Sequence, residues 1–170
     1  MQTLHRLAFH ALPALALSAT LVVACADSRS AKEEIGALCS DLEGKVNDVK
    51  PIKGSDGEDD IYPRMRTQYT LLLDAEKKIK DSLGAGADKG ASGTFFTKWQ
   101  GFTRAMKKLR DTWHDPYAGL PATSGSDTTA ILRVSVAKDD ADSALGSLDV
   151  AAKTYGLEQC GKQIHWRISS

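Results

Sequence analysis

The sequence predicts an all-α fold, a four-helix up-down bundle with one disulfide. Apolar residues recur at steps of three and four over four long segments, residues 29–50, 61–83, 94–113 and 126–155, and this spacing is typical of one face of an amphipathic helix. Stretches rich in Gly, Pro and acidic residues separate the segments and predict loops. Helices of this length, about 30 Å each, favour antiparallel packing when short loops join them.

Proline and glycine residues mark where the first two segments begin and end. Pro51 lies just past the first segment, and residues 51–60 read as a loop. Pro63 is tolerated because it falls in the first turn of the second segment, and residues 84–93 predict a flexible connector. The first apolar face comprises Ile35, Leu38, Leu42, Val46 and Val49, and the second comprises Ile61, Met65, Tyr69, Leu72, Ile79 and Leu83.

The third segment is the most aromatic and the fourth is the richest in small residues. Asp115-Pro116 ends the third segment. Gly156 is placed to end the fourth as a left-handed C′ residue, with Leu157 giving the hydrophobic contact of a Schellman motif. The third inner face comprises Phe95, Trp99, Phe102, Met106, Leu109 and Trp113. The fourth comprises Ile131, Val134, Ala137, Ala141, Leu145, Leu148, Ala152 and Tyr155.

The N-terminus has the pattern of a secretory signal peptide. Arg6 gives a basic start, and the run from Leu7 to Ala24 contains no Asp, Glu, Lys or Arg. His10 and Pro13 interrupt this run, which leaves less than the about 20 apolar residues that span a bilayer. We therefore predict export with cleavage, leaving about 146 of the 170 residues, enough for one domain.

The end of this run, Val22-Val23-Ala24-Cys25, resembles the lipobox of bacterial lipoproteins, although Val22 stands where that family most often has Leu. The resemblance implies that residues 1–24 are removed and that Cys25 becomes a lipidated N-terminus bearing acyl chains such as palmitate. The lipid would anchor the protein to the outer face of the cell membrane. However, Ala24-Cys25-Ala26 also fits ordinary signal peptidase, which would cut before Asp27 and release a secreted protein.

Under the lipoprotein interpretation, residues 25–30 form a short tether, residues 31–160 the helical bundle domain and residues 161–170 a C-terminal tail. The usage of Ala, Gly, Asp and Arg, together with the ending Tyr155 to Gly161, is similar to small exported helical proteins of high-GC Gram-positive bacteria. That resemblance implies no particular activity.

The three cysteines are Cys25, Cys39 and Cys160, and either cleavage leaves the last two to pair. Cys39 lies on the inner side of the first segment, and Cys160 follows the fourth. In an up-down bundle the first and fourth helices are antiparallel neighbours, so we predict a Cys39–Cys160 disulfide in the exported protein. The chain-entropy model gives nearly ~5 kcal/mol for closing such a long loop.

Composition and motifs give little sign of catalysis. The mature chain has 21 basic and 22 acidic residues, because Arg6 is the only formal charge in the leader, and this balance argues against nucleic-acid binding. The mature chain has two histidines, His114 and His165, and no serine lies in a Gly-x-Ser-x-Gly motif. The acidic group Asp56, Glu58, Asp59 and Asp60 lacks the EF-hand order. We predict no catalytic residue, cofactor or metal site.

A possible interaction face comprises Lys98, Arg104, Lys107 and Lys108, mostly opposite the aromatic stripe of the third segment. These cations could meet anionic lipid or wall polymer, or they could be an ordinary solvated face. We predict a non-catalytic, membrane-tethered envelope protein that binds another protein or an envelope component. The alternatives are an extracytoplasmic carrier of a small or apolar ligand, and a hydrolase or metal enzyme around His114 or the acidic group.

Overall fold

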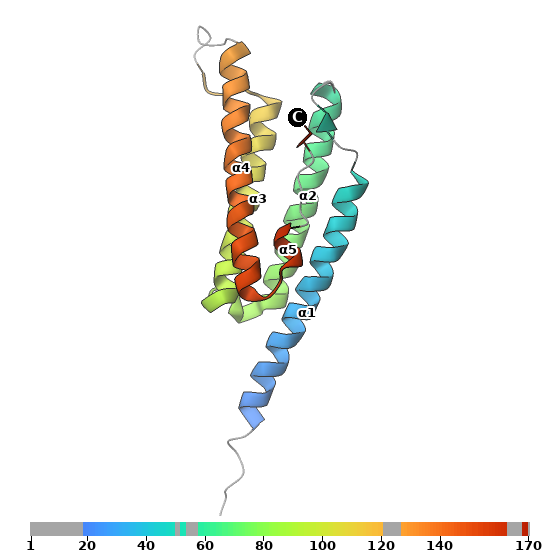
Figure 1. Ribbon diagram of the computed structural model, residues 1–170, viewed down its shortest axis with the longest axis vertical. Coiled ribbons are helices and arrows are strands. Elements are labelled where there is room, and N and C mark those ends of the chain that lie inside the picture. Colours follow the sequence, from blue (N-terminus) through green and yellow to red (C-terminus); the bar gives the residue numbers. More distant parts are fainter. Residues whose placement is uncertain (1–18, 50–51, 54–57, 121–126, 163–167, 170) are drawn as a thin grey trace, which may run out of the picture.

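The computed structural model describes residues 19–49, 52–53, 58–120, 127–162 and 168–169. Four long helices dominate this part of the chain (Figure 1), which confirms the all-α prediction. They are α1 (Ala19–Asp48), α2 (Glu58–Leu83), α3 (Gly90–His114) and α4 (Asp127–Tyr155).

Four short elements accompany the long helices. The 3-10 helix η1 (Gly84–Gly86) follows α2, and the one-turn helix α5 (Gln159–Lys162) follows α4. Strands β1 (Ile52–Lys53) and β2 (Ile168–Ser169) form a two-residue parallel pair, with Ile52 opposite Ile168. This pair places the C-terminal strand beside the connection between α1 and α2.

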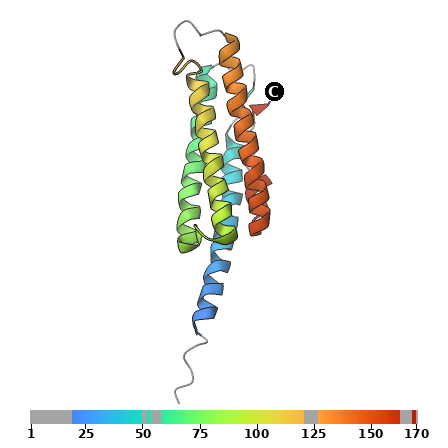
Figure 2. The ribbon, with the colours of Figure 1, turned by 90° about the vertical axis from the view of Figure 1, so that its left-hand side faces the viewer.

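The helices pack in sequence order. Helix α2 packs on α1 and on α3, α3 packs on α4, and α5 packs on both α4 and α1. Figure 2 shows the long helices side by side, with the N-terminal part of α1 extending beyond the others. Helix α5 therefore connects the first and last long helices.

Two predicted connections are partly helical. Residues 51–60 were expected to form a loop, but α2 already begins at Glu58, where acidic side chains are favoured by the helix dipole. As a result Pro63 lies in the second turn of α2 and not in the first, and its missing N–H leaves one helical carbonyl without its usual donor. Similarly, α3 begins at Gly90, inside the predicted connector.

The core lies between the four apolar faces. Trp99, Phe95 and Phe102 of α3 are fully buried at its centre, and the ring of Phe95 stacks on that of Tyr155 at a centroid distance of 5.5 Å. Helix α4 contributes small buried side chains to the same core, namely Ala137, Ala141 and Ala152. The predicted core positions Trp99 and Phe102 are thus confirmed.

One predicted core position is wrong. Ile131 is 70% exposed, although it was assigned to the inner face of α4. It lies six residues before the buried Ala137, and six residues rotate a helix by about 240° from that position. Ala130, seven residues before Ala137, continues the inner stripe and is half-buried.

The end of α4 has the predicted Schellman motif. Gly156 has a φ of +84°, and its N–H donates to the carbonyl oxygen of Lys153 at 3.0 Å. The N–H of Leu157 donates to the carbonyl oxygen of Ala152 at 2.8 Å, and the Leu157 side chain is buried. This turn sends the chain back towards α1.

The Cys39–Cys160 disulfide is present, with 5.1 Å between the two Cα atoms, and the two cysteines are 121 positions apart in the sequence. It joins α1 to α5, so α5 supplies the link between the first and last long helices. Gly161 permits this position, because a Cβ there would lie only 2.4 Å from the Cα of Asp149 on α4. The disulfide therefore holds α5 against α1, and close packing at Gly161 holds α5 against α4.

Candidate functional site

The four predicted surface cations all lie on α3 and all are exposed, but they do not share one environment. The ammonium group of Lys107 pairs with Asp111 at 2.7 Å, one turn along the same helix. Lys108 instead reaches Asp140 of α4 at 2.7 Å. Arg104 donates from Nε to the carbonyl oxygen of Gln100 at 3.2 Å. The predicted face is thus divided between the α2 side and the α4 side of α3.

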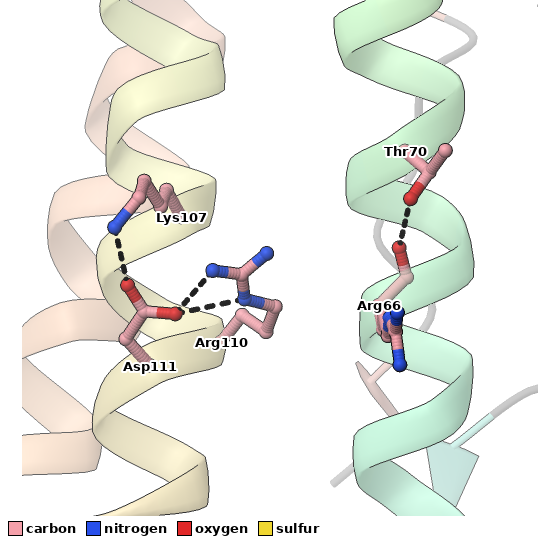
Figure 3. A network of polar contacts seen from close by, with 5 residues as sticks. All are labelled: Arg66, Thr70, Lys107, Arg110 and Asp111. Atoms are coloured by element: carbon pink, nitrogen blue, oxygen red, sulfur yellow. Dashed lines mark hydrogen bonds and ion pairs between the residues drawn. The ribbon is translucent and has the colours of Figure 1, made fainter.

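A polar network on α3 comprises Lys107, Arg110 and Asp111 (Figure 3), and Arg110 also contacts α2. The guanidinium of Arg110 binds the carboxylate of Asp111, with Nε at 2.8 Å from Oδ1. The same guanidinium lies over the ring of Tyr69 on α2, 4.4 Å from its centroid. Such a cation–π contact is stabilising because the ring face carries negative electrostatic potential. Arg110 thus holds the Tyr69 ring in place.

Asp111 is the acidic centre of this network. Partial burial raises the pKa of its carboxyl group, but hydrogen bonds from Lys107 and Arg110, together with their positive charges, outweigh that effect. The net result is a pKa of Asp111 below its ordinary value of 3.8. Asp111 is therefore ionised at neutral pH, and its charge is shared by two cations.

A groove lies between α2 and α3, next to this network. It has a volume of about 260 Å³ and is lined by Tyr69, Leu73, Glu76, Gln100, Thr103 and Arg104. We call this cavity the α2–α3 groove. Thr103 is almost fully buried, and its hydroxyl donates to the carbonyl oxygen of Trp99 at 3.1 Å. Leu73 is 40% exposed.

Three exposed cations on α2 and α3 have no ion pair in the described structure, and one of them, Arg104, lines the groove. Arg66 and Lys77 lie on the same side of α2 as Leu73, because they are seven residues before it and four after it. Within the described residues, neither of them nor Arg104 has an ion pair. Glu76 is the acidic residue of the lining. The lining of the groove therefore combines the apolar surface of Leu73 and Tyr69 with one cation, Arg104, and one acid.

A second exposed surface lies on the N-terminal half of α4. Leu132 is 62% exposed, and Val136, one turn further on, is 47% exposed. Together with Ile131 these residues form what we call the α4 apolar patch. Helical spacing could have identified it, since residues 132 and 136 are one turn apart and lie away from Ala137.

Among the residues considered for catalysis or metal binding, His114 is the last residue of α3 and does not belong to the groove lining. His114 is exposed, and its ring stacks on Tyr62 with 4.1 Å between centroids. Asp56 and His165 lie outside the described residues, while Glu58 to Asp60 form the first turn of α2. Within the described ranges, no three His, Cys, Asp or Glu side chains come together as they would around a metal ion.

The predicted lipidation site lies in α1. The backbone of Cys25 belongs to this helix, whereas its side chain and residues 1–18 of the leader lie outside what the structure describes. Ala31, six residues later, is buried. No helix in the described part of the chain has a stretch both long and apolar enough to cross a membrane.

Comparisons with known proteins found no relative of this chain. The chain matches no protein-family model, and neither the curated proteins nor the solved structures give a significant match. The surfaces described above are therefore the basis for a functional proposal.

Proposed function

We propose that this protein is a non-catalytic binding module that is exported and tethered to the outer face of the cell membrane through a lipid on Cys25. Its function is to hold another protein or an envelope component. The observation that carries the binding role is the α2–α3 groove, where exposed Leu73 and half-buried Tyr69 lie beside Arg104, a cation without an ion pair in the described structure.

The position of Cys25 supports the tether. An α-helix rises about 1.5 Å per residue, so Cys25 lies roughly 9 Å along α1 from Ala31, where the helix is already buried against its neighbours. A lipid on Cys25 would hold the helical domain close to the bilayer surface. The N-terminal part of α1 projects from one end of the molecule (Figures 1 and 2), and the lipid would leave from that end.

The up-down order of the four helices is part of the same proposal. Contact between each long helix and the next along the chain supports it, as does the short connection through η1 between α2 and α3. In this arrangement the α2–α3 groove runs along the side of a rigid scaffold, which is a favourable base for recognition because little order is lost on binding.

The carrier alternative has less support. It requires a gap between the bulky residues of α3 and the small residues of α4, but Trp99, Phe95 and Phe102 are fully buried there and pack against the alanines of α4. Secretion after cleavage before Asp27 would leave the groove unchanged and would remove only the tether.

The intact mass of the native protein, purified from its own cells, tests the tether. We expect a chain that begins at Cys25 and carries added acyl mass, and we expect the protein in the membrane fraction. A Cys25→Ala variant should lose both the acyl mass and the membrane association. A native chain that begins at Asp27 and remains in the medium would show a secreted protein and would refute the anchor.

A further inference from the structure

We infer that the outward face of α4 binds an amphipathic helix of a partner protein, with apolar side chains towards both ends of the contact and a Lys or Arg of the partner at its centre. The face consists of six exposed positions, which we call the α4 outer stripe: Leu132, Val136, Asp139, Ser143, Gly146 and Val150. The inference rests on the proposed protein-binding function, and it adds a second surface to the α2–α3 groove.

The spacing of the α4 outer stripe suits a helix as its partner. Its six positions follow one another at steps of four and three residues. Such steps keep side chains on one line of a helix, here opposite the buried Ala141. Leu132 and Val150 are 18 positions apart, which corresponds to about 27 Å along the helix axis. One α-helix packs along another with this periodicity, so the stripe can receive a partner helix over its full length.

Exposed apolar side chains are concentrated on α4. Leu132 is 62% exposed, Val136 47% and Val150 63%, and Ile131 lies beside the stripe. These four are the most exposed large apolar side chains in the described part of the chain. Helix α4 packs on α3 and α5, and Figure 1 shows it at the margin of the array of long helices. Apolar side chains gathered on one outward face are typical of contact with another protein.

The middle of the stripe determines the shape of the partner. Ser143 and Gly146 are small, and a Cβ placed on Gly146 would meet no other atom within 4 Å. Val136 and Val150 stand on either side of this low region. A partner helix can therefore insert a bulky side chain over Gly146 and contact the valines with its neighbouring apolar positions, as knobs enter holes in a coiled coil.

The charge of the stripe comes from Asp139 alone. Asp139 has no ion pair in the described structure. The adjacent Asp140 and Asp142 differ from it, because Lys108 and Lys138 pair with them at 2.7 Å and 2.8 Å. A Lys or Arg opposite Asp139 would form a new ion pair between two apolar contacts, whereas an acid or an apolar residue there would leave the carboxylate unpaired. The partner helix is therefore basic at its centre.

A second copy of this chain fits the stripe less well. Two copies anchored through Cys25 in one membrane point in the same direction, so their α4 helices would pair in parallel and place Asp139 against Asp139 of the other copy. Like charges at such a position destabilise a contact. An antiparallel pair avoids this clash, but it would send the projecting ends of the two α1 helices, and with them the lipids, in opposite directions (Figures 1 and 2). The tether therefore favours a helix of another protein.

Fluorescence anisotropy tests the inference with the full mature chain carrying Cys25→Ala, which removes the lipid and leaves α4 unchanged. The probe is a fluorescein-labelled helical peptide with Leu at the a and d positions of its heptads and one Lys at the central d position. The control peptide has Glu in place of that Lys. We expect saturable binding of the Lys peptide, about tenfold tighter than binding of the Glu peptide, because only the Lys peptide pairs with Asp139.

Charge reversal locates the central contact. Asp139→Lys should lower the affinity for the Lys peptide about tenfold and raise the affinity for the Glu peptide by a similar factor, because the ion pair is then restored with the signs exchanged. Asp81→Lys makes the same change at an exposed acid of α2 and should alter neither affinity. The exchange of preference is a result that a loss of folding cannot produce.

Two matched pairs of variants test the shape of the stripe. Leu132→Ser should weaken binding of the Lys peptide about tenfold, whereas Leu73→Ser, at an exposed leucine of the α2–α3 groove, should have no effect. Gly146→Leu fills the low region and should also weaken binding about tenfold. Gly44→Leu, at an exposed glycine of α1, should leave it unchanged. Circular dichroism should show the original fold in both glycine variants, because neither position has another atom within 4 Å of an added Cβ.

Three results would overturn the inference. Absence of binding, or equal binding of the Lys and Glu peptides, would show that Asp139 does not select a basic helix. Sedimentation of the protein alone as a dimer that Leu132→Ser dissociates would identify a second copy as the occupant. Binding to phosphatidylglycerol vesicles that Leu132→Ser abolishes would identify a lipid surface. None of these results alters the intact mass of the native protein, so the tether is confirmed or refuted separately.

Discussion

The two halves of α4 are held by very different forces. In the C-terminal half, Leu148 and Ala152 are fully buried, Tyr155 stacks on Phe95, and α5 is joined by the disulfide to α1. In the N-terminal half, Ile131 and Leu132 face outwards. Both halves bury alanines on their inner face, and what differs is that α5 also covers the C-terminal half.

Polar contacts also join the N-terminal half of α4 to α3 and to the residues just after it. Arg133 donates to the carbonyl oxygens of Pro116 at 2.7 Å and Ala118 at 3.0 Å, just after α3. Lys108 and Asp140 form an exposed ion pair between α3 and α4, and such pairs contribute about 0–1 kcal/mol. We expect the stability of the fold to be concentrated at the α5 end, and the predictions below measure that contrast.

Removal of the disulfide should have the largest effect. The double variant Cys39→Ala, Cys160→Ala frees α5 from α1 and should lower the free energy of unfolding by about 2–5 kcal/mol, because the unfolded chain gains the entropy of a long open loop. Urea denaturation of the variant and the oxidised protein measures the difference. A loss below about 1 kcal/mol would mean that packing alone holds α5.

Equivalent truncations in the two halves of α4 provide the most direct comparison. Leu148→Ala removes a fully buried side chain and should cost about 3 kcal/mol in the free energy of unfolding. Leu132→Ala changes the same residue type at an exposed position and should stay within about 0.5 kcal/mol. Equal losses in urea denaturation would refute the proposed contrast between the halves.

A pair of glycine substitutions tests how closely α5 packs on α4. Gly161→Ala forces a methyl group against the Asp149 backbone and should cost about 1–3 kcal/mol. Gly146→Ala, in the exposed interior of α4, meets no atom within 4 Å and should stabilise the protein by about 0.4–1 kcal/mol. Thermal unfolding of both variants should therefore show shifts of opposite sign, and a neutral Gly161→Ala would mean that α5 moves easily.

Periodicity allowed the helices and much of the core to be predicted. The repeats that contain Ile35, Trp99 and Leu148 set the buried faces, and these three residues are fully buried. Ile131 was assigned to the inner face by counting two successive steps of three residues back from Ala137. Two such steps leave Ile131 about 120° away from the inner stripe, whereas one step of seven residues reaches Ala130 with nearly the same orientation as Ala137. Local spacing must therefore be followed over two turns to locate a face.

The groove could not be predicted in the same way. Leu73 and Arg104 belong to different helices, and their meeting in one groove depends on the relative register of α2 and α3. Whether a cation finds an acid is also a tertiary property. Lys108 pairs with Asp140, 32 residues away, while Arg104 has no acidic partner in the described structure. The four predicted cations are exposed, as expected, but the neighbouring helices determine which of them has an acidic partner.

The smallest predicted effect concerns Asp111, on α3 beside the groove. Its pKa is lower in the folded protein than in the unfolded chain, so its contribution to stability is present above the unfolded value near 3.8 and is lost as the pH falls through the lower folded value. Asp111 is substantially exposed, so Asp111→Asn should cost only about 0.2–1 kcal/mol at pH 7.

The pH dependence separates this charge effect from a general loss of packing. Urea denaturation should show the difference between Asp111→Asn and the original protein shrinking as the pH falls below 3.8, because both proteins then carry a neutral side chain at this position. Asp81→Asn, at an exposed residue of α2, is the matched control and should show little change at either pH. A loss in Asp111→Asn that persists unchanged in acid would mean that the Asp111 side chain acts through its shape, and the ionic account of the rigid groove wall would then be wrong.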